Sequence, residues 1–208
     1  MNIQNIKSQF PIFSKKINGK HLVYLDSSNS SQKPLSVINR LDSFYKNEFS
    51  NIGRSIHSLA VNATNKFEET RVSVKNFINA ESKDEIIFTK NATESINLVA
   101  TTFGQQNIKK GDEIIITELE HHSNYVPWHY LRETKGAIIK FLPINEDGDI
   151  VIEKLKDLIT TKTKIIAVTH LSNVTGTIVP IKEIVEIARK KKCTSLGRWL
   201  SKCSAYKN

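Results

Sequence analysis

Two adjacent histidines, His121 and His122, are the residues of this sequence whose type and setting most directly suit chemistry. They lie in the polar segment 120–124, shortly after an apolar run that ends at Thr117. An imidazole exchanges protons near neutral pH, and the loop that leaves the carboxyl end of a strand is where open α/β sheets bind ligands. We therefore interpret segment 120–124 as a candidate site, with a solvated loop or a helix cap as the alternative interpretation.

Two further polar segments stand in comparable places. Asn91, Ala92 and Thr93 join an apolar run to a stretch with helical spacing. The first turn of a helix has backbone N–H groups that bind phosphate, and Thr93 adds a hydroxyl; an ordinary N-cap is the open alternative. Asn173 lies in the polar segment 169–177, after another apolar run. Three such segments at one edge of a sheet make a stronger site hypothesis than any one alone.

The elements that must position these segments alternate along the chain. Runs rich in isoleucine predict strands, and apolar residues at three-and-four spacing predict helices. Strands that alternate with helices are typical of parallel βαβ units, so the expected fold class is α/β with a sheet buried on both faces. The predicted strands are 85–89, 113–117, 137–142 and 164–169, after a short one at 21–25, and the predicted helices are 35–48, 62–80, 93–103, 124–135, 153–159 and 181–191.

The composition disfavours several classes of protein. With 39% apolar and 25% charged residues among 208, the chain has the composition of a globular protein. Its net charge of +9 comes from bases interspersed with acids, which disfavours nucleic-acid binding. No apolar run approaches the ~20 residues that span a bilayer, and Cys193 and Cys203 make no disulfide framework, so we expect a soluble cytoplasmic protein. Nucleotide-loop, serine-hydrolase and zinc-protease motifs are absent from the sequence, and no metal site is expected.

Seven separated motifs carry a resemblance to a known family. They are Tyr24-Leu25-Asp26-Ser27, Gln32-Lys33-Pro34, Arg54 with Ile56-His57, Phe77-Ile78-Asn79-Ala80, residues 93–100, residues 120–124 with Val126-Pro127-Trp128, and residues 169–177. In this order they resemble the SufS-type, or group II, cysteine desulfurases and selenocysteine lyases, which are class V aminotransferase-like proteins. The resemblance runs from about residue 8 to residue 192 and covers only about the N-terminal half of such an enzyme.

This resemblance implies a fold, a cofactor and an activity. The fold is the large domain of pyridoxal-phosphate-dependent transferases of fold type I, the aspartate-aminotransferase-like class, with an incomplete, mainly parallel sheet and helices on both faces. The cofactor is pyridoxal 5'-phosphate, and the intact family is homodimeric. The reaction converts L-cysteine to L-alanine and leaves the sulfur as an enzyme persulfide, which a sulfur-acceptor protein takes for iron–sulfur cluster assembly.

The resemblance also assigns roles to individual residues. Ala92 and Thr93 would hold the cofactor phosphate, and His121 would stack on the cofactor ring and relay protons. Asn173 would bond near the ring hydroxyl or the substrate carboxylate, and Arg54 would lie at the substrate entrance. These pairings agree with the chemistry of each group, because helix-end N–H groups suit a dianion and an imidazole suits a flat ring. Gly53 stands where the family usually has histidine, which affects the expected substrate specificity.

The alternation of strands and helices stops at Cys193. The family's motifs for the Schiff-base lysine that holds the cofactor, for the aspartate at the ring nitrogen and for the persulfide cysteine do not occur in the sequence, so the 208-residue chain is predicted to be inactive as written. If the codons of residues 193–207 are read one base later, permitted choices spell an apolar strand followed by the missing Val-Asp-Gly-Ser-Gln motif. We hypothesise a single-base frameshift near Lys192, so that 193–208 is an out-of-frame tail.

These observations predict three domains and leave three functional hypotheses. The predicted domains are 1–61, an N-terminal arm and helix, 62–192, a partial cofactor-binding large domain, and 193–208, the tail. The first functional hypothesis is a fragment of a cysteine desulfurase. One alternative is a non-catalytic module that binds a full-length homologue or a sulfur acceptor, and another is a different class V aminotransferase-like enzyme.

Overall fold

The computed structural model describes residues 2–27 and 29–191 of the chain. The chain divides into two compact units, Met1–Val72 and the part that begins at Ser73. The predicted domain boundaries at 61 and 192 stay a prediction, and the predicted tail, 193–208, lies outside the described residues.

The first unit contains an N-terminal arm and two helices. Its hairpin turns at Asn18 and Gly19, whose φ angles of 51° and 77° suit a tight Asn-Gly turn between antiparallel strands. Of the strand predicted at 21–25 only His21 pairs, because the strand opposite has just two residues. The elements in order are α1 (Ile3–Lys7), η1 (Pro11–Ser14), β1 (Lys16–Ile17), β2 (Lys20–His21), α2 (Leu35–Asn47) and α3 (Ser58–Phe77).

A carboxylate joins the two longer helices of this unit. Glu48 follows α2 and lies 2.7 Å from Lys66 Nζ on α3 and 2.8 Å from the Arg40 guanidinium on α2. The hydrogen bonds from Lys66 and Arg40 hold the pKa of Glu48 below its usual value. Glu48 therefore links the end of α2 to the middle of α3 by ion pairs.

The second unit is built on a parallel sheet, as predicted. β3 (Glu113–Thr117) is the central strand, with β4 (Ile138–Leu142) on one side and β5 (Thr163–Ala167) on the other. Ile115 is the register partner of Lys140 in β4 and of Ile166 in β5. Because all three strands run in one direction, their carboxyl ends meet at one edge of the sheet.

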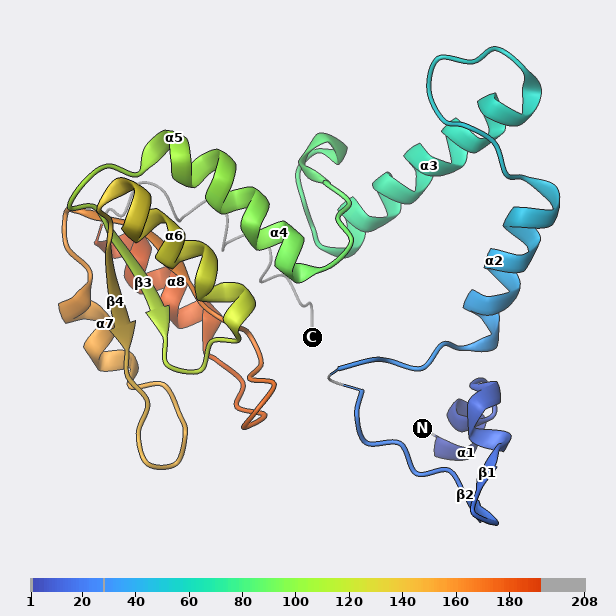
Figure 1. Ribbon diagram of the computed structural model, residues 1–208, viewed down its shortest axis with the longest axis horizontal. Coiled ribbons are helices and arrows are strands. Elements are labelled where there is room, and N and C mark those ends of the chain that lie inside the picture. The colour runs from blue at the N-terminus through green and yellow to red at the C-terminus, as the bar shows by residue number, and fades with distance from the viewer. Residues whose placement is uncertain (1, 28, 192–208) are drawn as a thin grey trace. The chain divides into compact units, whose positions relative to one another are not determined.

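Helices cover both faces of this sheet (Figure 1). Successive residues of a strand point to opposite faces, so Ile114 and Ile116 pack with Trp128 on one face, and Ile115 packs on the other. Ile114, Ile115 and Ile116 are all fully buried, which confirms the predicted burial of both faces. The helices on the first face are α4 (Ala92–Val99), the π-helical turn η3 (Ala100–Gly104), α5 (Gln105–Asn107) and α6 (Val126–Lys135), and those on the second are α7 (Ile152–Leu158) and α8 (Ile181–Lys190).

The strand predicted at 85–89 is wrong. A 3-10 turn, η2 (Lys83–Glu85), occupies its start, and residues 86–89 belong to neither sheet of the described part of the chain. Ile86 is nevertheless buried, with extended backbone angles of φ −90° and ψ 114°. Ile87 and Phe88 are exposed, so the predicted burial holds for Ile86 alone. A strand also requires a neighbouring strand at hydrogen-bonding distance.

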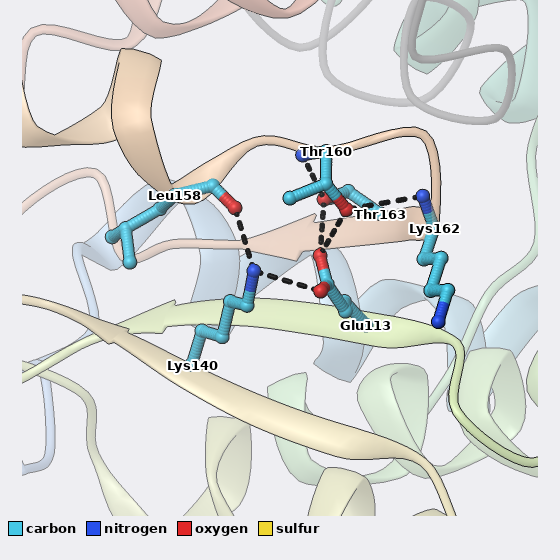
Figure 2. A network of polar contacts seen from close by, with 6 residues as sticks. All are labelled: Glu113, Lys140, Leu158, Thr160, Lys162 and Thr163. Atoms are coloured by element: carbon cyan, nitrogen blue, oxygen red, sulfur yellow. Dashed lines mark hydrogen bonds and ion pairs between the residues drawn. The ribbon is translucent and has the colours of Figure 1, made fainter.

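A polar network joins the amino ends of β3 and β5 to the middle of β4 (Figure 2). The Glu113 carboxylate at the start of β3 accepts hydrogen bonds from the hydroxyls of Thr160, at 2.7 Å, and Thr163, at 3.0 Å, and pairs with Lys140 Nζ at 2.8 Å. Lys140 also donates to the backbone oxygen of Leu158 at 3.0 Å. This network crosses from β4 through β3 to β5 at the sheet edge opposite the three polar segments.

Gly104 is expected to tolerate no larger residue. A Cβ added there would lie 2.6 Å from Leu131 Cδ1, and Leu131 of α6 is fully buried. Gly104→Ala should therefore lower the free energy of unfolding by about 1–3 kcal/mol through overpacking, measured by urea denaturation. Leu131→Ala in the Gly104→Ala background is the control, because it removes the side chain that the new methyl would meet, so the cost of Gly104→Ala should be smaller there than in the parent chain. Equal stability of Gly104→Ala and the parent chain would contradict the close packing of η3 on α6.

Candidate cofactor and substrate site

His121 lies in the turn that follows β3 at the carboxyl edge of the sheet. It caps a 3-10 turn, η4 (His122–Asn124), and the backbone N–H of Ser123 donates to its Nδ1 at 3.1 Å. Because Nδ1 is the acceptor, a neutral His121 ring carries its proton on Nε2. The ring is exposed, and the centroid of the His122 ring lies 6.2 Å away at an interplanar angle of 89°. The two imidazoles therefore present differently oriented faces, and only His121 is fixed by a hydrogen bond from its own turn.

The N-terminus of α4 combines a helix cap with N–H groups that the cap does not use. Asn91 is the N-cap, and its Oδ1 accepts from the backbone N–H of Glu94 at 2.9 Å. The Glu94 carboxylate accepts in turn from the backbone N–H of Lys90. Ala92 and Thr93 form the start of the first turn, and both residues are exposed. The N-cap interpretation and the phosphate interpretation are therefore compatible, since Asn91 caps while Ala92 and Thr93 remain accessible.

Asn173 lies at the exposed end of a tight turn after β5. Leu171 and Ile178 form a bridge at the base of this turn, and the Ser172 N–H donates to the Thr177 oxygen at 3.0 Å. Ser172 is buried, and its hydroxyl accepts from the backbone N–H groups of Val174 and Thr175. The turn is therefore held from inside by Ser172, and the Asn173 amide is left exposed to solvent.

The structure brings these segments together at the carboxyl edge. α4 packs against η4, so α4 lies close to the turn that begins with His121. The Glu120 carboxylate joins the His121 turn to the chain beyond β5, because it accepts from the backbone N–H of Thr169 at 2.8 Å. The contact joins the two elements that carry these residues, and the roles of Ala92, Thr93, His121 and Asn173 stay predictions.

Arg54 belongs to the first unit, and its role at the substrate entrance stays a prediction. It is exposed in the segment between α2 and α3. The preceding Gly53 has a φ of 97°, a conformation that side chains rarely adopt, and its N–H donates to Thr64 Oγ1 at 3.1 Å. The backbone here thus favours the glycine that replaces the family's usual histidine.

Four residues near His121 have polar contacts that the sequence did not predict individually. Thr117, Glu120, Asn124 and Trp128 form a continuous chain of hydrogen bonds beneath His121. Their spacing of three and four residues was the available signal, although such spacing is also common on any helix. A cavity of about 400 Å³ adjoins this chain of bonds on the His122 side. Its lining residues are Thr117, Glu118, Glu120, His122, Tyr125 and Phe141.

Two further classes of site find no support in the part of the chain that the structure describes. Within residues 2–27 and 29–191, no three metal-type side chains come together as a set of ligands. None of the helices in the same residues has the length and apolar character that crossing a membrane requires.

The second unit is a three-layer α/β unit with an exposed imidazole and an exposed amide in the turns at its carboxyl edge, which is where open α/β sheets commonly bind ligands. Comparison with known proteins makes this more specific. Residues 23–196 match the family described as "Aminotransferase class-V". The chain belongs to this family.

Relatives and solved structures narrow the comparison to cysteine desulfurases. A probable cysteine desulfurase of Halalkalibacterium halodurans is 48% identical over 190 residues, which are 91% of this chain and 47% of the relative. The apo cysteine desulfurase of Thermococcus onnurineus NA1 superposes with a TM-score of 0.83 at 33% identity, over 90% of this chain and 45% of that one. A cysteine desulfurase of Escherichia coli superposes with a TM-score of 0.77 at 32% identity, over 92% and 47%.

These matches confirm the predicted fold. The second unit has the α/β architecture of the large domain of fold type I transferases, with a parallel three-stranded sheet between helices. The chain spans about half the length of the curated relatives it matches.

Proposed function

We propose that this chain forms the N-terminal part of the site of a pyridoxal-phosphate-dependent cysteine desulfurase. The observation that carries the proposal is the packing of α4 against η4, the turn capped by His121, at the carboxyl edge of the sheet. The relatives of this chain are named cysteine desulfurases. Phosphate and ring would then be bound by adjacent elements of one unit.

The residues at the α4 N-terminus have the chemistry that the cofactor's phosphate requires. Ala92 and Thr93 supply two backbone N–H groups at the positive end of a helix, and Thr93 supplies a hydroxyl. Asn91 satisfies the N–H of Glu94, so the cap organises this turn without occupying it. A phosphate dianion would find hydrogen-bond donors here. The nearby carboxylate of Glu94 already accepts a hydrogen bond from the backbone N–H of Lys90.

His121 and Asn173 would act on the rest of the ligand. His121 offers a flat exposed ring for stacking and an Nε2 that is free to exchange a proton with the substrate. Asn173 offers amide N–H groups for the ring hydroxyl or for the carboxylate of L-cysteine. Arg54 would add a positive charge at the substrate entrance. Bound pyridoxal phosphate supplies an electron sink for the bonds at the substrate Cα.

The intact protein would supply sulfur to other proteins. We infer that L-cysteine is its substrate, that L-alanine and a persulfide sulfur are its products, and that an acceptor protein takes this sulfur for iron–sulfur cluster assembly. A homodimer is the expected assembly. These inferences rest on the family and on the relatives, which are roughly twice as long as this chain.

We also propose that the 208-residue chain is inactive alone. The motifs for the tethering lysine and the persulfide cysteine do not occur in it, and Cys193 and Cys203 stand in a segment without resemblance to the family. A single-base frameshift near Lys192 accounts for the loss of alternation there. The sequence of the gene tests this point directly, because a desulfurase continuation must open in another frame downstream of the Lys192 codon.

Binding of a cofactor analogue tests the proposed site without need of the lysine. Pyridoxine 5'-phosphate, which lacks the aldehyde, is expected to bind the chain reversibly, measured by isothermal titration calorimetry. Thr93→Val should weaken binding about tenfold, since one charge-assisted hydrogen bond is worth about 1.5 kcal/mol or more. Thr101→Val, in η3 of the same helical segment, is the control and should leave the affinity unchanged. Failure of the parent chain to bind, or equal affinity of Thr93→Val, would contradict the assignment.

A further inference from the structure

We propose that Glu120 is a positioning residue, whose carboxylate holds the His121 turn in place relative to the chain that leads to Asn173. What the site binds rests on the proposed function. The positioning itself concerns this chain's own atoms and can be tested without a ligand.

Glu120 accepts three hydrogen bonds from three different parts of the unit. Its Oε1 accepts from the Thr117 hydroxyl at the end of β3, at 2.6 Å, and from the backbone N–H of Thr169 beyond β5, at 2.8 Å. Its Oε2 accepts from the Asn124 amide nitrogen at 2.7 Å. One side chain therefore fastens the ends of two neighbouring strands to the turn that carries His121.

The chain of bonds continues into the core. Asn124 Oδ1 accepts from Trp128 Nε1 of α6 at 3.0 Å. Trp128 is only 3% exposed and packs with Ile114 and Ile116 on the sheet face. Glu120 is thus tied through Asn124 to a side chain that cannot move without disturbing the core.

The network restrains the turn that carries His121. Glu120 precedes His121 and Asn124 closes the same turn, and the direct bond between their side chains joins the two ends of the three-residue segment 121–123. Inside that closed segment the Ser123 N–H sets the proton position on the His121 ring. A reacting group must be held within about 0.5 Å of its working position, and this closed turn provides such a restraint.

The three donors require a carboxylate. A hydroxyl, a backbone N–H and an amide NH₂ all point their hydrogens at Glu120. A carboxylate accepts all three, whereas a glutamine would turn an NH₂ group toward at least one donor. Glu120→Gln, although close in shape, should therefore break one arm of the network and leave two donors facing each other.

A neighbouring glutamate provides a matched control. Glu118 is exposed, and its carboxylate accepts a single bond, from the backbone N–H of Ile144 at 3.1 Å. Glu118→Gln changes the charge by the same amount two residues away and leaves the bonds to Thr169 and Asn124 intact. Any effect shared by the two variants is then an effect of charge alone.

The experiment uses nuclear magnetic resonance on the 208-residue chain. It measures the ¹⁵N chemical shifts of the His121 ring and the hydrogen-exchange rate of the Thr169 backbone amide. In the parent chain and in Glu118→Gln, the His121 ¹⁵N shifts should report the Nε2–H tautomer, with the His129 and His170 rings as internal references. In Glu120→Gln the single amide oxygen can stay with the two donors that share Oε1, so the bond to Asn124 should be lost and the His121 tautomers should mix. Glu120→Ala removes both oxygens, and there the Thr169 amide should exchange at least about tenfold faster, because it loses its acceptor. Thr117→Val, which is nearly isosteric, should give a smaller change in the same direction if Glu120→Gln fails to fold.

The possible results test the positioning role of Glu120 and the proposed function separately. Unchanged His121 shifts in Glu120→Gln together with unchanged Thr169 exchange in Glu120→Ala, or no change of either signal in Thr117→Val where that variant decides, would overturn the positioning role. If pyridoxine 5'-phosphate does not bind the parent chain while these two signals respond as expected, the proposed function fails and the role of Glu120 stands.

Discussion

Replacing Glu113 with glutamine is expected to lower the free energy of unfolding at pH 7 by about 3 kcal/mol, because removal of one partner of a buried ion pair leaves the other charge without compensation. The Glu113 side chain is 9% exposed and lies 2.8 Å from Lys140 Nζ. A glutamine keeps an oxygen for the hydroxyls of Thr160 and Thr163, but it removes the charge that faces Lys140. Urea denaturation followed by circular dichroism measures the difference.

The pH dependence of this effect has a definite sign. Burial raises the pKa of Glu113, but the hydrogen bonds from Lys140, Thr160 and Thr163 outweigh it, so this pKa lies below its ordinary value of 4.5. A carboxyl group whose pKa is lower in the folded state stabilises the fold above its unfolded pKa, and the stabilisation is lost as pH falls through the folded pKa. The difference between parent chain and Glu113→Gln should therefore be largest near neutral pH and shrink below about pH 4.

Glu133→Gln is the matched control for this substitution. Glu133 pairs with Arg132 at 2.9 Å, but its side chain is 69% exposed, so the loss should stay below about 0.5 kcal/mol. Glu113→Gln with the stability of Glu133→Gln, or a difference that does not shrink in acid, would show that the buried network contributes little to the fold.

The second large effect concerns activity. The 208-residue chain should release alanine from L-cysteine no faster than pyridoxal phosphate and cysteine without protein. A chain translated with the reading frame restored near the Lys192 codon should exceed this background by about a millionfold or more, the usual lower range of enzymatic acceleration. The reason is that the restored frame is expected to supply the tethering lysine and the persulfide cysteine. Alanine formation, measured by chromatography, compares the two chains directly.

The restored chain also provides the test of the site residues. Thr93→Val in that chain should slow alanine formation, while Thr101→Val should not. Significant alanine formation by the 208-residue chain itself would overturn the proposed inactivity. A restored frame that encodes no desulfurase continuation would overturn the frameshift.

The spacing of apolar residues predicted strands and helices correctly where local conformational preference and burial favour the same element. Isoleucine runs predicted β3 and β5, because strands buried on both faces are apolar without alternation. β4 was also predicted, although Ile138 and Phe141 in it are exposed. The helix after Asn91 was predicted from its spacing, and the structure places Asn91 as its N-cap. The segment 85–89 shows the limit of such rules, since its apolar residues are equally compatible with an extended segment outside the sheet.

The spacing of residues in the sequence could not predict the polar networks. Glu113 and Glu120 are two glutamates seven residues apart, and nothing in their spacing distinguishes them. Glu113 lies at the amino end of β3 and stabilises the sheet, while Glu120 lies past the carboxyl end and holds the His121 turn. Their partners, Thr163 and Thr169, are 50 and 49 residues away, so only the parallel pairing of β3 with β5 brings them within hydrogen-bonding distance.

The sequence alone therefore determined the α/β class, the family resemblance and the identity of the residues at the carboxyl edge, because these depend on periodicity and on short motifs. The tertiary structure decided which of these residues act together. It packed α4 against the His121 turn and closed that turn through Glu120 and Asn124. The physical reason is that hydrogen bonds between distant residues depend on strand order and register, and these follow from the packing of the whole sheet between its helices.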